Sequence, residues 1–232
     1  MNILDMTGTW SKLDARVYNL VIAPALAKLY DSVCERFMPR DNLHDGMSLL
    51  DVGCGAGHLP ASLGRRFPTL QIQAVDLADE MVARAREATR GLDNVTVSQA
   101  DALQLPFGAE QFDFAISVAS IKHWPDRVRG LQEIFRVLRP GGRLYIIEVF
   151  RGASLTDAMA FLKHWRFATW PLPFLFASYF RRFVAGHGLA ASELEAFCHR
   201  AGFADLNAET YRDYLTVMVR CRKPAAPEGA RA

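Results

Sequence analysis

The chain of 232 residues is half hydrophobic and 22% charged, a composition that indicates a folded globular protein and excludes a disordered one. Its formal net charge of +2 is too small to indicate a nucleic acid or an anionic membrane as a partner. The four cysteines form no CxxC pair and have no histidine at metal-ligand spacing, so we expect neither a disulfide framework nor a metal site.

The N-terminal segment has no basic stretch followed by an apolar core, so it lacks the pattern of a signal peptide. No run reaches the roughly 18 consecutive apolar residues that a membrane-spanning helix requires. We therefore expect a cytoplasmic protein with reduced thiols, present as a monomer or a homodimer.

Residues 10–38 carry apolar side chains at spacings of three and four, which predicts helices. Pro24 is expected to begin the second of these helices. We assign residues 1–45 to an N-terminal helical cap.

Short apolar runs alternate with amphipathic segments over residues 46–150. The runs predict strands at 47–52, 70–75, 95–98, 112–118 and 144–149, and the other segments predict helices at 57–67, 79–90 and 125–138. Asp79 is expected to cap the second helix, and Pro140, Gly141 and Gly142 are expected to form the turn before the last strand. This alternation predicts an α/β fold with a doubly wound, mostly parallel sheet.

Residues 151–190 interrupt the alternation with many aromatic and several basic side chains, and we assign them to a helical lid. Ser192 and Glu195 are then expected to form the capping box of a helix that ends at Ala201. Two further strands, at 203–210 and 214–221, complete the core sheet within residues 191–223. Residues 224–232 are expected to form a disordered tail.

A glycine-rich loop follows the first predicted strand and opens the first helix of the alternating region. Gly53, Gly55 and Gly57 let the backbone turn sharply and approach a ligand without interference from a Cβ atom. The helix N-terminus offers unpaired N–H groups to that ligand. The dinucleotide fingerprint has its last glycine at the sixth position, where this chain has His58. Gly57 at the fifth position favours a rounder loop, suited to a single nucleoside with an amino-acid tail.

Two acidic residues follow at the ends of the next two predicted strands. Asp76 lies where an acid binds ribose in nucleotide folds, and a carboxylate can accept hydrogen bonds from both vicinal hydroxyls. Asp101 lies where an acid can accept from the exocyclic amine of adenine. Either residue alone could simply cap a turn. The loop and both acids together, each at a strand end, predict a nucleotide site at the carboxyl edge of the sheet.

Five ordered segments make the chain resemble the class I S-adenosylmethionine-dependent methyltransferases, especially the type 11-like branch that acts on small molecules. They are LLDVGCGAGHLP, AVDLADEM, QADALQLPF, FDFAISV and EIFRVLRPGGRLYIIE, within residues 46–150. The resemblance implies a Rossmann-like sheet of seven strands with a reversed last hairpin, which fits residues 203–221. It also implies S-adenosylmethionine as the cofactor and S-adenosylhomocysteine as the product.

The resemblance further implies which residues bind this cofactor. Gly53 and Gly55 would lie against the methionine moiety, and Asp76 would hold the ribose. Asp51 would either face the ammonium group of the ligand or only stabilise the glycine turn. The other implied contacts are Leu77 and Met81 beside the adenine, Asp101 with Ala102 at its edge, Val118 and Ala119 near the methionine end, and Tyr18 from the N-terminal helices.

Residues 117–126 follow the fourth predicted strand and should approach the transferred methyl group. His123 is the best candidate for a general base, because its ordinary pKa of about 6.5 lets it accept a proton near neutrality. A structural or substrate-positioning role is its alternative. Trp124 is expected to pack in the interior, and Lys122 is expected to be a solvated surface residue. The tetrapeptide of nucleic-acid amino-methylating relatives and the acidic cluster of magnesium-dependent ones do not occur here, so we expect neither nucleic acid nor metal.

Together these features predict methyl transfer, by in-line displacement, to a small apolar or aromatic metabolite held under the aromatic lid. Two alternatives stay open. One is a cofactor-binding protein without transferase activity, and the other is a membrane-lipid methyltransferase whose lid contacts the membrane. The glycine spacing disfavours a nicotinamide oxidoreductase.

Overall fold

The computed structural model describes residues 46–162 and 188–225 of the chain. The predicted helical cap over residues 1–45, which contains Tyr18, lies outside these ranges. Residues 163–187 of the predicted lid and residues 226–232 of the predicted tail also lie outside them. Within the predicted lid, the described chain contains helix α6, Leu155–Leu162.

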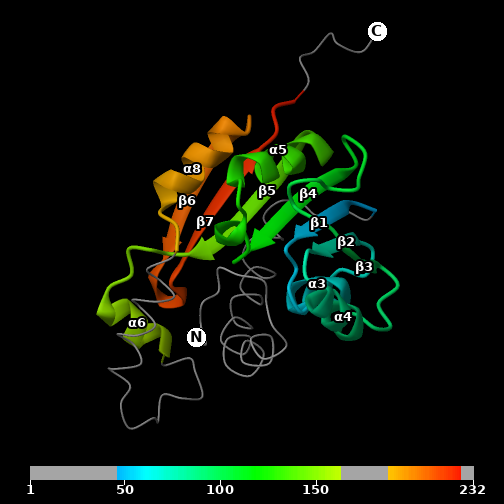
Figure 1. The fold of residues 1–232 in the computed structure, drawn as a ribbon, viewed down its shortest axis with the longest axis horizontal. Helices are drawn as coiled ribbons and strands as arrows, with labels where there is room; N and C mark the ends of the chain where they lie inside the picture. The colour runs from blue at the N-terminus through cyan, green and yellow to red at the C-terminus, as the bar shows by residue number, and fades with distance from the viewer. Residues whose placement is uncertain (1–45, 163–187, 226–232) are drawn as a thin grey trace.

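The described strands form one mixed sheet in the order β3-β2-β1-β4-β5-β7-β6 (Figure 1). Strands β1 to β5 run parallel to their neighbours among themselves, whereas β7 is antiparallel to both β5 and β6. Their bounds are β1 Ser48–Val52, β2 Gln71–Asp76, β3 Val95–Gln99, β4 Phe112–Val118, β5 Leu138–Val149, β6 Ala204–Tyr211 and β7 Thr216–Arg222. The order confirms the predicted α/β sheet of seven strands with a reversed last hairpin.

Helices pack on both faces of this sheet. They are α3 His58–Arg66, α4 Asp79–Ala88, α5 Arg127–Val137 and α8 Ala191–Arg200. Leu49 of β1 packs in one buried cluster with α3, and the next residue, Leu50, packs in another with α5 and α8. Successive strand side chains point to opposite faces, so a strand covered on both faces must be apolar throughout. That requirement explains the continuous apolar runs in the sequence.

Two element boundaries differ from the prediction. Strand β5 begins at Leu138, so Pro140, Gly141 and Gly142 lie inside the strand, at an irregularity in its pairing with β4. The predicted turn is therefore wrong. Helix α4 has Ala78 as its N-cap, with no side-chain hydrogen bond, and Asp79 is its first residue. Asp79 thus contributes a negative charge in the first turn instead of a cap.

The predicted capping box at α8 is also wrong. The N-cap of this helix is Ala190 rather than Ser192. The acid three residues later is then Glu193, whose Oε2 accepts a hydrogen bond from the Ala190 N–H at 2.9 Å. Glu193 also pairs with Arg151, which connects the start of α8 to the end of β5.

The strand order reverses between β1 and β4, which are neighbours although β2 and β3 lie between them in the chain. In open parallel sheets, ligands bind at the carboxyl ends of the strands beside such a reversal. Here those ends are Val52, Asp76 and Val118. The fold therefore brings the glycine loop, the ribose candidate and the start of the proposed acceptor segment to one edge.

The segment between β3 and β4 is fixed to α5 by an ion pair between a buried glutamate and a half-buried arginine. Glu133 is 5% exposed and accepts a hydrogen bond from the Leu105 N–H at 3.0 Å. Arg136 pairs with Glu133 at 2.7 Å and donates to the carbonyls of Leu105 and Phe107. These charge-assisted bonds satisfy backbone groups of a long connection and so fix the loop that carries Asp101.

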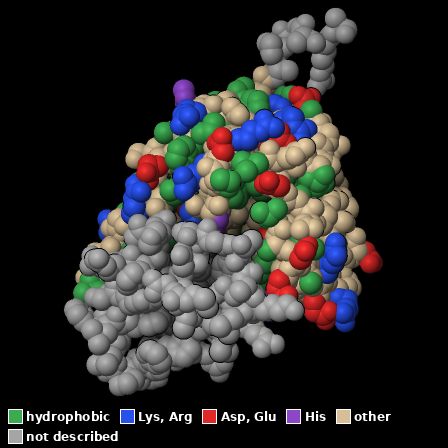
Figure 2. Space-filling model, in the orientation of Figure 1, with side chains coloured by type: hydrophobic (Ala, Val, Ile, Leu, Met, Phe, Trp, Pro, Cys, Tyr) green, Lys and Arg blue, Asp and Glu red, His purple; other side chains and the backbone are tan. Residues whose placement is uncertain are grey.

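The surface of the described part mixes charges. On the face shown in Figure 2, basic and acidic side chains are interspersed and do not separate into fields of one sign. Within residues 46–162 and 188–225, no helix combines the length and the apolar character needed to cross a membrane.

Gly57, the N-cap of α3, contacts α4, and this contact gives a stability prediction. Its φ is +80°, and a Cβ atom there would lie 2.6 Å from the Ala85 Cα atom. We expect Gly57→Ala to lower the free energy of unfolding by about 3 kcal/mol, through left-handed strain and overpacking. Gly91 has the same φ of +80° but open space around its Cβ position, so Gly91→Ala should cost only about 1 kcal/mol. Urea unfolding measures both, and equal losses would contradict the packing argument.

Candidate active site

The glycine-rich loop leaves the carboxyl end of β1 and is bonded at once to β2. The N–H groups of Gly53 and Cys54 both donate to the Val75 carbonyl, at 2.8 and 2.9 Å. Gly53 has a φ of +78°, and a Cβ atom on it would overlap the Ser120 side chain. Both the backbone conformation and this neighbour therefore require glycine at position 53.

The Asp76 carboxylate at the end of β2 holds the loop from the other side. Its Oδ2 accepts from the Gly55 N–H at 2.9 Å, and its Oδ1 accepts from the Ala78 N–H at 3.0 Å. Burial raises the pKa of Asp76, and these N–H groups oppose that effect because they favour the carboxylate. The Leu77 N–H also favours the charged form of Asp76, and a carboxylate has about four acceptor positions, so the carboxylate keeps acceptor capacity for a ligand.

Asp51 is a buried carboxyl group inside β1, with 1% of its surface exposed. Its Oδ2 atom has no hydrogen-bond partner in the described part of the chain. Burial, and to a lesser extent the negative charge of Asp76, raises the pKa of Asp51 to about 8. A buried polar atom without a partner is costly unless a ligand completes its hydrogen bonding. We interpret Asp51 as part of a site for a cationic group.

Cys54 lies between Gly53 and Gly55 in the loop, close to the carboxyl groups of Asp51 and Asp76. Burial, followed by the negative charges of Asp51 and Asp76, raises the pKa of the Cys54 thiol well above its ordinary range. The thiol is therefore protonated at neutral pH, and thiolates are the reactive form of cysteine. We therefore interpret Cys54 as a small residue that fits the loop and has no reactive role.

The side chains expected beside adenine lie beyond β2. Leu77 is 60% exposed although it is large and apolar. Its carbonyl accepts a hydrogen bond from Gln99 Nε2 at 3.0 Å, a contact between the ends of β2 and β3 that the sequence did not reveal. Met81 is 4% exposed and packs against Ala56 of the glycine loop. Leu77 therefore offers an open apolar surface, whereas Met81 supports the loop from its buried side.

Asp101 and Ala102 lie two and three residues after β3. Asp101 is exposed, and its Oδ1 accepts a hydrogen bond from the Leu103 N–H at 2.9 Å. Ala102 is half-buried against the core cluster shared with α5. Both residues therefore lie at the same edge of the sheet as Asp76.

The carboxyl end of β4 contains a strained residue. Val118 is the last residue of the strand and is 9% exposed. The next residue, Ala119, has a φ of +54°, which side-chain-bearing residues rarely adopt. Its N–H donates to the Ile147 carbonyl of β5 at 2.7 Å. Such strain persists only where the surroundings determine the conformation, and it gathers at functional sites.

The residues after Ala119 contact the glycine loop. Ser120 lies beside Gly53, and its Oγ accepts a hydrogen bond from Trp124 Nε1 at 3.1 Å. Trp124 is buried, as predicted. His123 is half-buried in the 3₁₀ helix η4, Ile121–His123, and its N–H donates to the Ser120 carbonyl at 2.9 Å. The predicted base thus lies on the segment that contacts the loop.

Lys122 is not the solvated surface residue that its sequence context predicted. It is half-buried, and burial lowers the pKa of its ammonium group while the negative charge of Glu148 acts in the opposite direction. Glu148, near the end of β5, is 1% exposed, and its Oε1 accepts a hydrogen bond from the Lys122 N–H at 3.3 Å. Our sequence reasoning missed Glu148. The signal that could have revealed it is an acid at the end of an apolar strand.

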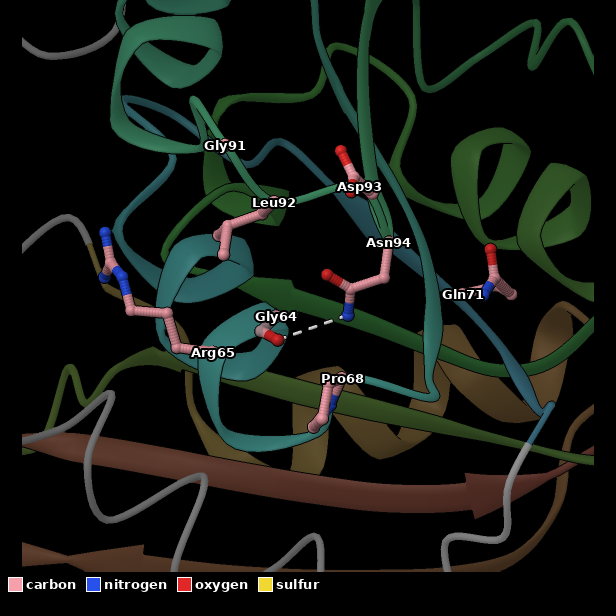
Figure 3. Close-up of a pocket in the computed structure, with 8 residues that line it drawn as sticks. All are labelled: Gly64, Arg65, Pro68, Gln71, Gly91, Leu92, Asp93 and Asn94. Carbon is pink, nitrogen blue, oxygen red and sulfur yellow. Dashed lines mark hydrogen bonds between the residues drawn. The ribbon is translucent and has the colours of Figure 1, made fainter.

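A separate surface hollow of about 550 Å³ lies at the opposite, amino edge of the sheet, where Gln71 begins β2 (Figure 3). Asn94 lines this hollow and donates through Nδ2 to the carbonyls of Gly64, Phe67 and Leu70. These bonds hold the end of α3 to the start of β3. We therefore interpret this hollow as a by-product of structural packing, far from the carboxyl edge.

The order of these parts agrees with a known family. Residues 50–146 match the family described as "Methyltransferase domain". Residues 50–146 of this chain therefore carry a class I methyltransferase domain. The methyl donor of that class is S-adenosylmethionine, and the matched range contains the glycine loop, both strand-end acids and His123.

Three curated relatives share part of this chain. Over 134 residues it is 37% identical to methyltransferase GfsG of Streptomyces halstedii, covering 57% of this chain and 48% of GfsG. It is 34% identical over 128 residues to 2-methyl-6-phytyl-1,4-hydroquinone methyltransferase 2 of Oryza sativa, covering 54% of this chain and 36% of that protein. It is 31% identical over 115 residues to demethylmenaquinone methyltransferase of Staphylococcus aureus, covering 49% and 48%. The chain thus spans about half or less of the length of these relatives.

Solved structures share the fold over more of the chain. A SAM-dependent methyltransferase from Aquifex aeolicus is 22% identical, with a TM-score of 0.63 over 86% of this chain and 98% of that one. The [4+2]-cyclase SpnF is 22% identical, with a TM-score of 0.61 over 96% and 85%. At this identity the likeness shows the fold alone, and the fold by itself does not determine the reaction.

The buried Asp51 carboxyl predicts how stability changes with pH. Its folded pKa of about 8 exceeds the ordinary value of 3.8, so the native state holds this proton more tightly than the unfolded state. The free energy of unfolding of the wild type, measured relative to that of Asp51→Asn, should therefore fall as pH rises from 5 to 7. The expected slope is about 1 kcal/mol per pH unit. Urea unfolding of both proteins across this range measures the slope.

Asp113→Asn is a matched control for this slope. Hydrogen bonds from Arg139 and Ser48 outweigh partial burial and lower the pKa of Asp113, so its proton is already lost in both states above pH 5. Its stability difference from wild type should be constant between pH 5 and 7. A flat profile for Asp51→Asn as well would refute the assignment of a raised Asp51 pKa.

Proposed function

We propose that this protein transfers the methyl group of S-adenosylmethionine to a small apolar or aromatic acceptor. The Asp76 carboxylate carries the proposal. It is bonded to the glycine loop through the Gly55 N–H and keeps acceptor capacity beyond its bonds to backbone N–H groups. The hydroxyls of a ribose are donors that this remaining capacity can accept.

The residues around Asp76 fit the rest of this cofactor. Asp51 offers the methionine ammonium a buried oxygen that has no partner in the described chain, and a nearby cation would favour the Asp51 carboxylate. Gly55 has open space at its Cβ position, which leaves the backbone open to the methionine part, and we assign Gly53 to the same contact. Leu77 offers an apolar surface to one adenine face. We assign the other contacts to Met81, Asp101 and Ala102 around the adenine, to Val118 at the methionine end, and to Tyr18 from the N-terminal segment.

When bound, S-adenosylmethionine supplies a methyl group on a sulfonium, which is already activated for displacement. The protein therefore has to align the acceptor and exclude water, and these contributions are its main part in the rate. We propose that His123 accepts the proton of an acceptor group that must lose one. Its position on η4, next to the segment that contacts the glycine loop, supports this role.

We propose hydroquinones and related phenols as the acceptor class. Two of the three relatives are named for a hydroquinone or a quinone. An electron-rich ring with a hydroxyl group supplies the nucleophile that displacement needs. A neutral phenol has a pKa near 10, so a base is required to make its anion near neutral pH. We assign the removal of this phenol proton to His123.

Two measurements test the proposal. Calorimetry with S-adenosylhomocysteine and with NADH tests the cofactor class, and tighter binding of NADH would contradict it. Mass spectrometry of chemically reduced demethylmenaquinone after incubation with S-adenosylmethionine tests transfer. Binding of S-adenosylhomocysteine without product from phenols, hydroquinones or amines would favour a cofactor-binding protein without transferase activity.

Asp76→Ala should weaken S-adenosylhomocysteine binding by about 1–3 kcal/mol, because charge-assisted hydrogen bonds to the ribose are lost. Calorimetry measures this change. Asp79→Ala, an exposed acid three residues along the chain, is the matched control and should leave the affinity unaltered. If both variants bind like wild type, the ribose assignment is wrong.

His123→Ala should lower kcat about 100-fold with reduced demethylmenaquinone, since a positioned base contributes this much or more. The affinity for S-adenosylhomocysteine should stay within a factor of about two, because His123 faces the acceptor in this proposal. His199→Ala, at an exposed position of α8, serves as the control. Unchanged turnover of His123→Ala at every pH would exclude the base assignment.

A further inference from the structure

We propose that Glu148 is a positioning residue, which holds segment 119–124 against the glycine loop by accepting hydrogen bonds from the start of η4. The inference rests on the proposed function in one respect: in that function this segment faces the acceptor. The geometry itself stands without it.

The first observation is the place of the Glu148 carboxylate. It is 1% exposed near the end of β5, and its Oε1 accepts from the Lys122 N–H at 3.3 Å. The Ile121 N–H also favours its charged form. These are the first two N–H groups of η4, which have no partner inside so short a helix. A side chain from a neighbouring strand therefore caps this helix.

The second observation is that the segment is attached on its other sides. The Ala119 N–H donates to the Ile147 carbonyl at 2.7 Å, one residue before Glu148 on β5. Arg127 donates through Nη2 to the Lys122 carbonyl at 3.1 Å. These bonds account for how Ala119 keeps its strained φ of +54°. The Glu148 carboxylate supplies the bonds at the middle of the segment.

The third observation links this segment to the cofactor loop. Ser120 fills the space that a side chain at Gly53 would need, and Trp124 donates to Ser120 Oγ at 3.1 Å. Contacts therefore run from Glu148 through the start of η4 to Ser120 and Gly53. A displacement of η4 would move His123 relative to the loop, and small misplacements of a reacting group reduce rates strongly.

A purely structural role explains the carboxylate poorly. Burial raises the pKa of Glu148, so burial disfavours its charge, and the ammonium group of Lys122 and three N–H groups act in the opposite direction. Replacing both members of a pair of buried opposite charges by apolar groups of similar size is often neutral or stabilising. Stability alone therefore gives little reason for an acid at this position, whereas a rigid acceptor-side segment does.

Glu148→Met and Glu148→Gln form the test pair. Both remove the charge and keep the side-chain length, but only glutamine keeps an oxygen that can accept the η4 N–H groups. With S-adenosylhomocysteine bound, amide hydrogen exchange in residues 117–126 should be about tenfold faster in Glu148→Met and close to wild type in Glu148→Gln. Asp113→Asn, a carboxylate at the amino end of β4, should leave exchange in this segment unchanged.

Activity supplies the second readout. With reduced demethylmenaquinone, Glu148→Met should lower kcat at least about tenfold, with the KM and the S-adenosylhomocysteine affinity within about twofold of wild type. Glu148→Gln should recover most of the kcat. Wild-type exchange in Glu148→Met would overturn the proposal. So would equal losses in both variants, which would assign the effect to the charge beside Lys122. Exchange needs no acceptor, so a wrong acceptor class and a wrong role for Glu148 give different results.

Discussion

The hydrogen bond from the Gly55 N–H to the Asp76 carboxylate is the contact on which the rest of the site depends. It joins the loop after β1 to the end of β2. The parallel pairing of these strands makes the bond possible, because parallel neighbours end at the same edge. Without it the loop would keep its glycines but lose its fixed relation to the acid that we assign to the ribose.

Polar side chains are hydrogen-bonded differently at the two edges of the sheet. At the amino edge, Asn94 and Asp113 form several bonds to the chain itself, and these bonds hold helix and strand ends together. At the carboxyl edge, Asp51 has an oxygen without a partner in the described residues, and Ala119 is strained. Hydrogen bonds at the amino edge thus stabilise the fold, whereas the carboxyl edge keeps polar groups that a ligand can bond. This division is typical of open α/β sheets.

The sheet and the strand-end acids were predictable because apolar runs bounded by glycine leave few alternatives. Parallel pairing then places Asp76 and Asp101 at one edge without further information. Glu148 and Lys122 could not be paired in this way, because their contact joins residues 26 apart and depends on β4 lying beside β5. The helix starts at Ala78 and Ala190 were missed because alanine has no side-chain cap to recognise. The lack of a hydrogen-bond partner for Asp51 Oδ2 in the described residues depends on how this side chain is buried in the fold. Sequence periodicity alone does not reveal that burial.

The protonated thiol of Cys54 has a consequence for a protein that handles methyl sulfonium compounds. Such compounds are electrophiles, so a thiolate beside one would be methylated. A single reaction of this kind would inactivate the enzyme. Burial is the main cause of the raised pKa of that thiol, and Asp51 and Asp76, which we assign to binding the methyl donor, raise it further. The site that we assign to the methyl donor therefore keeps the thiol protonated, and a cysteine can occupy a position where a thiolate would be methylated.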